Sequence, residues 1–216
     1  MPAPLPPLPP AFRVTDADVR PGGRNMIDIL SGDHLQLALL CDRLAPDGSA
    51  RSLPPALRRP PVVDVLIATL TRHLCAEEQY LYPTVRAVLA DGDHVADHEL
   101  VEHAAMAHTL RRLQTVAAGD PEFPRLVDAI TAHVRRHASR ASREILPRLR
   151  AACTDNELIR LGNRVEIAQE AAPTRPHPAT PVSPPANKLV DPAMGVIDKV
   201  RDVLTGRRTR VGQLHI

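Results

Sequence analysis

The stretch of this sequence with the clearest chemical potential places a histidine and a glutamate four residues apart. His73 and Glu77 stand in RHLCAEEQYLYP, residues 72–83. Residues four apart on an α-helix project from one face, and an imidazole and a carboxylate on one face can hold a single metal ion. The stretch therefore predicts part of a metal site on a helix.

A weaker copy of this stretch occurs later in the chain. In RHASRASREILP, residues 136–147, the arginine, histidine and proline return at the same spacing around His137, but Ala141 stands where the first copy has Glu77. Whether and how the protein binds metal depends largely on this difference.

Composition narrows the class of protein. A chain of 216 residues with 44% hydrophobic content suits one domain plus tails. The net charge is only +2 and aromatic residues make up 2% of the chain. Because recognition of nucleic acid by stacking needs aromatic platforms and a basic surface, we expect no nucleic-acid partner.

The cysteines and the N-terminus indicate the compartment. Cys41, Cys75 and Cys153 are odd in number and form no CxxC pair, which is typical of reduced thiols. Six prolines among the first ten residues disrupt a secretory signal, and no later apolar run is long enough to span a bilayer. We therefore expect a cytoplasmic protein without stable membrane insertion.

Proline-rich stretches divide the chain into four parts. The sequence predicts a disordered arm over residues 1–23, a four-helix bundle with a short fifth helix over 24–171, a linker over 172–190, and a C-terminal amphipathic helix with a basic tail over 191–216.

Apolar residues at intervals of three and four predict long helices over residues 27–45, 62–89, 93–118 and 122–152. Pro83 is expected to bend the second helix without ending it. A capping box at Thr154–Glu157 predicts the start of the fifth helix. Two of the three connections between the long helices are short turns. This indicates an all-α fold, an antiparallel up-down four-helix bundle.

One histidine interrupts the apolar stripe of each long helix, and antiparallel pairing brings these residues to similar heights: His34, His73, His103 and His137. Burying Glu77 among them without a partner would cost several kcal/mol. A metal ion explains the convergence, and a mixed set of imidazoles and a carboxylate suits iron, manganese or zinc.

Together these residues resemble the bacterial hemerythrin-like proteins of the HHE cation-binding type over about residues 27–152. The matching elements are His34, HLCAEEQYLYP, Glu102-His103, and His137 ahead of EILP. The resemblance implies non-heme iron, usually two ions bridged by carboxylate and oxygen, that binds oxygen, handles nitric oxide or peroxide, or senses iron. The proline-rich linker and terminal helix are similar to extensions on some actinobacterial members.

The chain departs from the family pattern at Ala141, where an acidic ligand is expected. A mononuclear or asymmetric site of one or two ions is the consequence. His133, one turn before His137, either replaces the missing ligand or is a partly exposed residue near two arginines, and Glu78 either orients an imidazole or is solvated. Glu102 with His98 forms a further pair beside the main stripe. Tyr80 and Tyr82 either pack or shield a bound oxygen species.

The terminal helix has two interpretations. It docks on the bundle or on a protein partner through Val196, Val200 and Val203, which we favour, or it uses basic residues for an anionic surface: Lys199, Arg201, Arg207, Arg208 and Arg210.

The leading hypothesis is thus a hemerythrin-like protein that binds iron through His34, His73, Glu77, His103 and His137, and that binds or senses oxygen, nitric oxide, peroxide or iron. The small partner would be a diatomic molecule or a peroxide, and binding or sensing is favoured over catalysis. The alternative is a metal-free bundle that serves as a protein-interaction or structural module.

Overall fold

The computed structural model describes residues 22–44, 61–176, 198, 202 and 207–214. Most of the predicted N-terminal arm, of the linker and of the terminal helix lies outside the described residues, so the predicted division into four parts stays a prediction.

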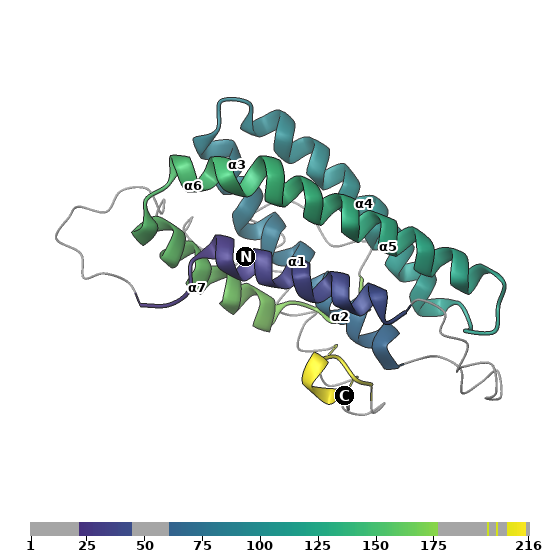
Figure 1. The fold of residues 1–216 in the computed structure, drawn as a ribbon. Helices are drawn as coiled ribbons and strands as arrows, with labels where there is room; N and C mark the ends of the chain where they lie inside the picture. The colour runs from purple at the N-terminus through teal and green to yellow at the C-terminus, as the bar shows by residue number, and fades with distance from the viewer. Residues whose placement is uncertain (1–21, 45–60, 177–197, 199–201, 203–206, 215–216) are drawn as a thin grey trace, which may run out of the picture.

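The described chain is helical, and four long helical rods run antiparallel to one another (Figure 1). The first rod is α1 (Met26–Asp42) and the third is α4 (Gly92–Thr115). The second joins α2 (Pro61–Ala76), the π-helix η3 (Glu77–Leu81) and α3 (Tyr82–Val88), and the fourth joins α5 (Glu122–Arg140), the π-helix η4 (Ala141–Ile145) and α6 (Leu146–Ala152). The prediction of an all-α antiparallel bundle is confirmed.

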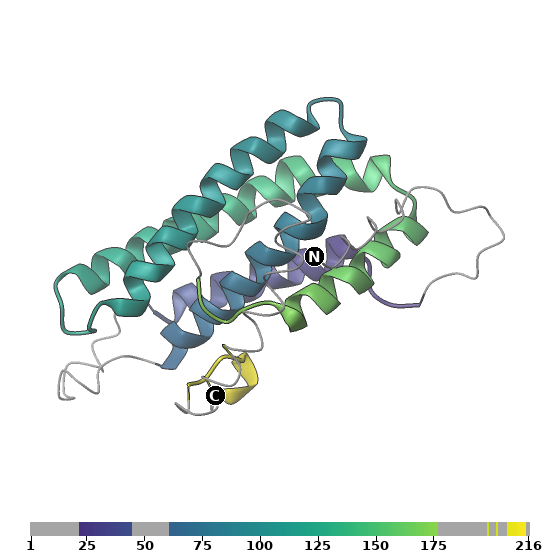
Figure 2. The same ribbon diagram turned by 180° about the vertical axis from the view of Figure 1, so that it is seen from behind.

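A fifth helix, α7 (Asp155–Ala171), lies along the outside of the bundle against α1 and α2 (Figure 2). Its start is the predicted capping box, in which the Thr154 side chain accepts from the Glu157 backbone N–H while the Glu157 carboxylate accepts from the Thr154 backbone N–H. A short 3-10 turn, η5 (Val211–Gln213), lies in the C-terminal segment of residues 207–214.

Both copies of the repeated motif adopt the same unusual backbone. The N–H of Tyr82, just before Pro83, donates to the oxygen of Glu77 five residues earlier, and the N–H of Leu146, just before Pro147, donates to the oxygen of Ala141. These are π-helical turns, which occur often at functional sites. As predicted, the second rod continues past Pro83, and the π-turn is the form that the chain adopts there.

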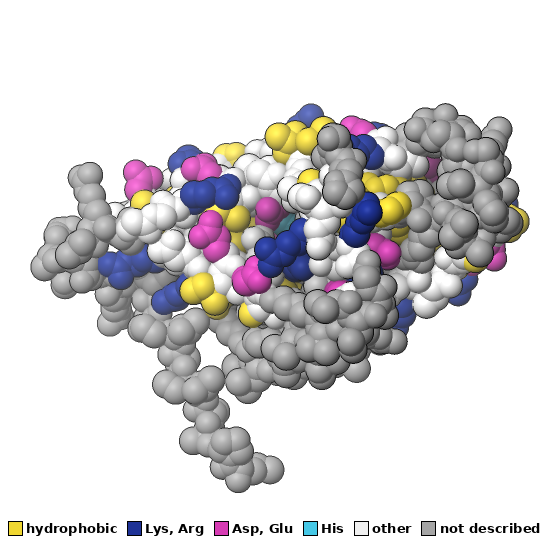
Figure 3. All heavy atoms as spheres, turned by 90° about the horizontal axis from the view of Figure 1, so that it is seen from below, with side chains coloured by type: hydrophobic (Ala, Val, Ile, Leu, Met, Phe, Trp, Pro, Cys, Tyr) yellow, Lys and Arg dark blue, Asp and Glu magenta, His cyan; other side chains and the backbone are white. Residues whose placement is uncertain are grey.

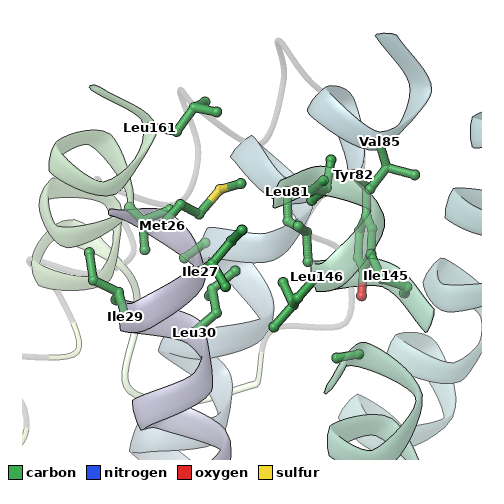
Figure 4. Close-up of a cluster of buried hydrophobic side chains, with 14 of the residues drawn as sticks. Met26, Ile27, Ile29, Leu30, Leu81, Tyr82, Val85, Ile145, Leu146 and Leu161 are labelled. Atoms are coloured by element: carbon green, nitrogen blue, oxygen red, sulfur yellow. The ribbon is translucent and has the colours of Figure 1, made fainter. Parts of the chain in front are cut away.

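The core consists of two clusters of buried aliphatic side chains. One joins the start of α1 to α3, α6 and α7 and includes Leu30, Leu81 and Ile145 (Figure 4). The other joins the end of α1 to α2, α4 and α5 and includes Leu37 and Leu70. The histidines of the sequence pattern lie between the two clusters, so apolar side chains close the bundle both above and below them. Among the described residues, no helix is long and apolar enough to cross a membrane.

Gly162 sets how closely α7 approaches the start of α1. A Cβ atom on Gly162 would lie 2.0 Å from the backbone oxygen of Arg24 and 2.9 Å from the carbonyl carbon of Asn25. Because backbone atoms cannot move aside as a flexible side chain can, α7 fits only with a hydrogen at this position.

We expect Gly162→Ala to lower the free energy of unfolding by about 2 kcal/mol, as overpacked sites do. Thermal and urea unfolding measure the change. The matched control is Gly32→Ala, also in a helix, where a Cβ would meet only the tip of the Arg24 side chain at 3.6 Å. Equal stability of the two variants would contradict this account of α7 packing.

Candidate metal centre

Four imidazoles and one carboxylate meet in the middle of the bundle. His34 comes from α1, His73 from α2, His103 from α4 and His137 from α5, and Glu77 is the first residue of η3. All five are buried, with Glu77 at 0% exposure. One ligand atom from each of His34, His73, Glu77 and His137 lies within 4.8 Å of the others. The structure therefore brings together all five residues of the sequence-based hypothesis.

The Glu77 carboxylate stands at the centre of this group. Its Oε1 lies 3.6 Å from Nε2 of His34 and 3.4 Å from Nε2 of His73. Its Oε2 lies 3.2 Å from Nε2 of His103 and 3.1 Å from Nε2 of His137. Each oxygen thus faces its own pair of imidazoles, an arrangement in which one carboxylate can supply a ligand atom to each of two metal positions.

Three of the imidazoles have a second carboxylate behind them, within 3.4 Å of Nδ1: Asp33 at 3.3 Å behind His73, Glu78 at 3.1 Å behind His103, and Glu99 at 3.4 Å behind His137. A carboxylate at Nδ1 holds a proton on that nitrogen and so leaves Nε2 to face the centre. Metal-bound histidines are usually oriented in this way.

The donor set fits a metal ion. Nε2 of His137 lies 3.2 Å from Nε2 of both His34 and His73, so three ring nitrogens crowd around the Glu77 oxygens. Groups that all offer lone pairs repel one another unless a positive charge lies among them. Neutral imidazole and ionised carboxylate are the forms that bind metal, and the set suits iron, manganese or zinc.

In the metal-free protein, protons supply this positive charge. Although burial opposes the charged form, the carboxylates of Glu77 and then Glu99 raise the pKa of His137 to about 10. Burial would raise the pKa of Glu77, but the imidazoles of His73 and His137 hold it well below its usual range. His34 behaves differently, because burial lowers its pKa to about 4 and keeps its ring neutral.

Tyr82 extends the cluster at its α3 end. Its hydroxyl donates to Oε2 of Glu77 at 3.1 Å and lies 2.8 Å from Nε2 of His103. Burial and then the Glu77 carboxylate raise its pKa well above its usual range, so the phenol keeps its proton. Both tyrosines also pack, since Tyr82 is a buried member of the apolar cluster of α1, α3, α6 and α7 and Tyr80 packs against it, and the shielding of a bound oxygen species stays a prediction.

The additional ligand candidates lie outside the cluster. The His133 side chain is partly exposed. Its Nδ1 lies 3.0 Å from Nη2 of Arg136 and 3.8 Å from Oε2 of Glu102, and not in the cluster that contains His137. Glu102 and His98 are exposed to a third or more of their side-chain surface. The prediction that His133 or Glu102 adds a ligand is therefore not supported by their placement, and Glu78 serves behind His103.

Sequence reasoning missed Asp33 and Glu99. Glu99 is 1% exposed and lies on the apolar stripe of α4, three residues after Ala96 and four before His103, so its stripe position and the ExxxH spacing are signals that could have found it. Asp33 precedes His34 directly, lies beside the stripe of α1 and carries no periodic signal.

Ala141 and its neighbour Arg140 define the altered side of the centre. Ala141 is 1% exposed and packs in the apolar cluster of α1, α3, α6 and α7. Nε of Arg140 lies 2.9 Å from Oε1 of Glu99. The second copy of the motif therefore contributes no carboxylate of its own, and its arginine pairs with a carboxylate from α4.

Proton displacement predicts the pH dependence of metal binding. A metal at Nε2 of His137 must replace a proton, and with a pKa of about 10 that proton is present throughout the neutral range. Affinity for Zn²⁺ should therefore rise between about pH 6 and pH 9, by up to about tenfold per pH unit for each proton displaced. Competition titrations measure this slope, and an indicator dye in weak buffer measures the protons released.

The control for this experiment is His108→Gln, which alters an exposed imidazole on α4 and should leave the slope unchanged. Affinity that stays constant over this pH range, or falls as pH rises, would contradict the assignment of Nε2 of His137 to the metal.

Comparison with known proteins gives a consistent picture. The family model described as the hemerythrin HHE cation binding domain matches residues 25–149. An uncharacterised hemerythrin-like protein of Schizosaccharomyces pombe is 25% identical over 136 residues, covering 62% of this chain and 67% of the relative.

Two further proteins match part of the chain. A DNA nickase of a Nostoc species is 26% identical over 119 residues, which cover 53% of this chain but only 32% of that protein. The crystal structure of a hemerythrin HHE cation binding domain-containing protein from Mycobacterium kansasii shares the fold, with a TM-score of 0.54 and 19% identity over 68% of this chain and 86% of that one.

Proposed function

Because this chain belongs to the hemerythrin HHE cation binding domain family, we propose that the buried cluster binds non-heme iron and that the protein binds or senses oxygen, nitric oxide, peroxide or iron. The observation that carries this proposal is the placement of Glu77. A fully buried carboxylate faces four Nε2 atoms, and three of those imidazoles have a carboxylate behind them.

In this proposal the iron would be held by donors drawn from the Glu77 carboxylate and four imidazoles that face it: His34, His73, His103 and His137. Bound iron with an open position supplies affinity for small oxygen and nitrogen species and the capacity for one-electron chemistry. The chain supplies the rest. Tyr82 offers a hydrogen-bond donor inside the site, and the two apolar clusters exclude water from it.

Glu77 also suggests how many ions the centre holds. Its Oε1 faces His34 and His73, and its Oε2 faces His103 and His137. With Ala141 in place of a second carboxylate, two ions would share one bridging group and less negative charge. We therefore propose a mononuclear site, or an asymmetric pair in which one ion is bound more weakly.

The charge balance of the metal-free centre favours a second candidate. Protonated His137 lies between Glu77 and Glu99, and Arg140 pairs with Glu99, so a proton and an arginine offset these two carboxylates without a metal ion. On this alternative the bundle is a structural or protein-interaction module. On either candidate we propose a cytoplasmic protein, and a protein partner at its C-terminal helix stays a proposal as well.

The metal content separates the two candidates. Protein purified without added metal should carry about one to two irons per chain by elemental analysis, and Glu77→Gln should weaken iron binding at least about 100-fold because it removes the central charge. The matched control is Glu102→Gln on the partly exposed side of α4, which should bind iron like the natural chain. Less than about 0.2 iron per chain, with no gain after anaerobic addition of Fe²⁺, would favour the metal-free module.

Restoring the missing carboxylate tests the number of ions. Ala141→Glu places a carboxylate one turn after His137, so iron stoichiometry should rise toward two, or the affinity of the weaker ion should rise about tenfold or more. Ser142→Glu, at the exposed neighbouring position, is the control. If Ala141→Glu folds and leaves both quantities unchanged, the α5 face does not take part in a second metal position.

A further inference from the structure

A cavity of about 410 Å³ lies beside the candidate metal centre, between the bundle and the C-terminal segment of residues 207–214. Side chains from three helices and from that segment form its wall. Most of them are polar, among them Asp33, Gln36, Thr69, Arg72 and Gln169, and Val211 is an apolar one. A cavity of this size can admit a hydrated ion or a small molecule.

The wall of this cavity is one side chain away from the centre. Oδ2 of Asp33 accepts a hydrogen bond from Nε2 of Gln169 at 2.5 Å and lies 3.3 Å from Nδ1 of His73. Of the four imidazoles, His34, next to Asp33 in sequence, has the most exposed side chain, at 7%. The face seen from below in Figure 3 shows a histidine between basic and acidic side chains.

Among the described residues, the ends of the bundle and the side between α4 and α5 are less favourable to a hydrated cation. The two apolar clusters lie at the two ends of the site, and a charged ion crossing them would lose its hydration. Between α4 and α5, Arg140 pairs with the buried Glu99 and presents a positive charge. The cavity wall instead carries three carboxylates, of Asp33, Glu166 and Glu170, against the two guanidinium groups of Arg72 and Arg210, and an excess of carboxylates attracts metal cations.

The C-terminal segment lies over this cavity and is tied down by polar contacts. Nη1 of Arg72 donates to the oxygen of Thr209 at 2.8 Å, and Nη2 of Arg210 lies 2.9 Å and 3.0 Å from the two oxygens of Glu170. Nε of Arg207 lies 3.2 Å from Oδ1 of Asp64 at the start of α2. The Arg210 and Glu170 side chains are both more than half exposed, so this ion pair is weak. The other contacts are stronger, because the Arg207 side chain is only 8% exposed and Val211 and Leu214 pack against the apolar cluster of α1, α2, α4 and α5. The bundle can stay folded while the segment lifts, since the four long rods do not run through it.

We propose that this cavity is the entrance through which the metal ion and small solutes reach the centre, and that residues 207–214 form its cover. The inference rests on the proposed metal site. It assigns a role to the C-terminal segment that the bundle alone does not need, because all the candidate ligands lie before residue 138.

The test follows the rate at which Co²⁺, a coloured probe, enters the full-length protein and the rate at which EDTA removes it. In the double variant Arg207→Ala and Arg210→Ala, both rates should rise about fivefold while the equilibrium affinity stays the same, since no ligand has changed. The control is the double variant Arg112→Ala and Arg148→Ala, which removes exposed ion pairs to Glu122 and Asp91 that lie away from the cavity.

A second variant narrows the cavity without touching the cover. Gln36→Trp adds bulk at an exposed wall position of α1 and should slow Co²⁺ uptake and removal by about fivefold or more. This variant decides the matter if the arginine double variant fails to fold.

The failures are distinguishable. A natural chain that takes up no Co²⁺ at any concentration overturns the proposed metal site itself. Tight Co²⁺ binding with rates that neither the cover variant nor Gln36→Trp changes overturns the entrance, and hydrogen exchange of residues 207–214 verifies that the arginine variant has released the cover. A change in affinity equal to the change in one rate alone would show that the segment acts on the ligands, which also overturns the entrance.

Discussion

The constraint on which the rest of this structure depends is the burial of one negative charge. Glu77 is fully enclosed, and a carboxylate there is tolerated only if positive or hydrogen-bond-donating groups surround it. Each of the four long rods answers this requirement with one histidine. Three further carboxylates set the orientation of the rings, and the apolar clusters above and below hold the rods at the distance that the contacts require.

The duplicated motif shows which of its parts are structural and which are chemical. Both copies keep the histidine and the π-turn ahead of a proline, so the backbone is shaped alike at Glu77 and at Ala141. Only the first copy keeps a carboxylate directed at the centre. In the second copy Arg140 engages Glu99 of α4, so negative charge on that side stands behind an imidazole. The asymmetry of the centre thus follows from two neighbouring residues of one helix.

Much of the fold and the inner part of the site could be predicted because both follow helical periodicity. His34, His73, His103 and His137 interrupt apolar stripes, and a stripe must face the core whatever the details of packing. Asp33 could not be found in this way, because it lies beside the stripe of α1. Glu99 occupies a stripe position of α4, but that it meets His137 of α5 depends on how one helix is rotated against another. Glu78 was weighed from its sequence position, but only the packing of α4 decides that it meets His103.

The contacts of the C-terminal region could not be predicted from the sequence either. Docking through Val196, Val200 and Val203 falls outside the described residues, and the contacts that the structure gives combine apolar packing of Val211 and Leu214 with ion pairs. Arg207 lies 3.3 Å from Asp202 and 3.2 Å from Asp64, and Arg175 lies 2.7 Å from Asp202. Two of the arginines that the sequence offered to an anionic surface, Arg207 and Arg210, contact acidic residues of this chain. Basic residues along a segment do not reveal whether the acidic groups that they bind belong to the same chain or to another molecule.

The fifth helix has a consequence for where this protein can be divided. Homology places the end of the shared domain at residue 149, before α7 begins, and every candidate ligand lies inside that limit. Yet Gln169 of α7 donates to the same Asp33 oxygen that faces His73, and Gly162 lets α7 lie against the start of α1. The end of the family match and the end of the structural unit that the contacts define therefore differ. A chain shortened to its recognisable domain would keep its ligands and lose part of what holds one of them in place.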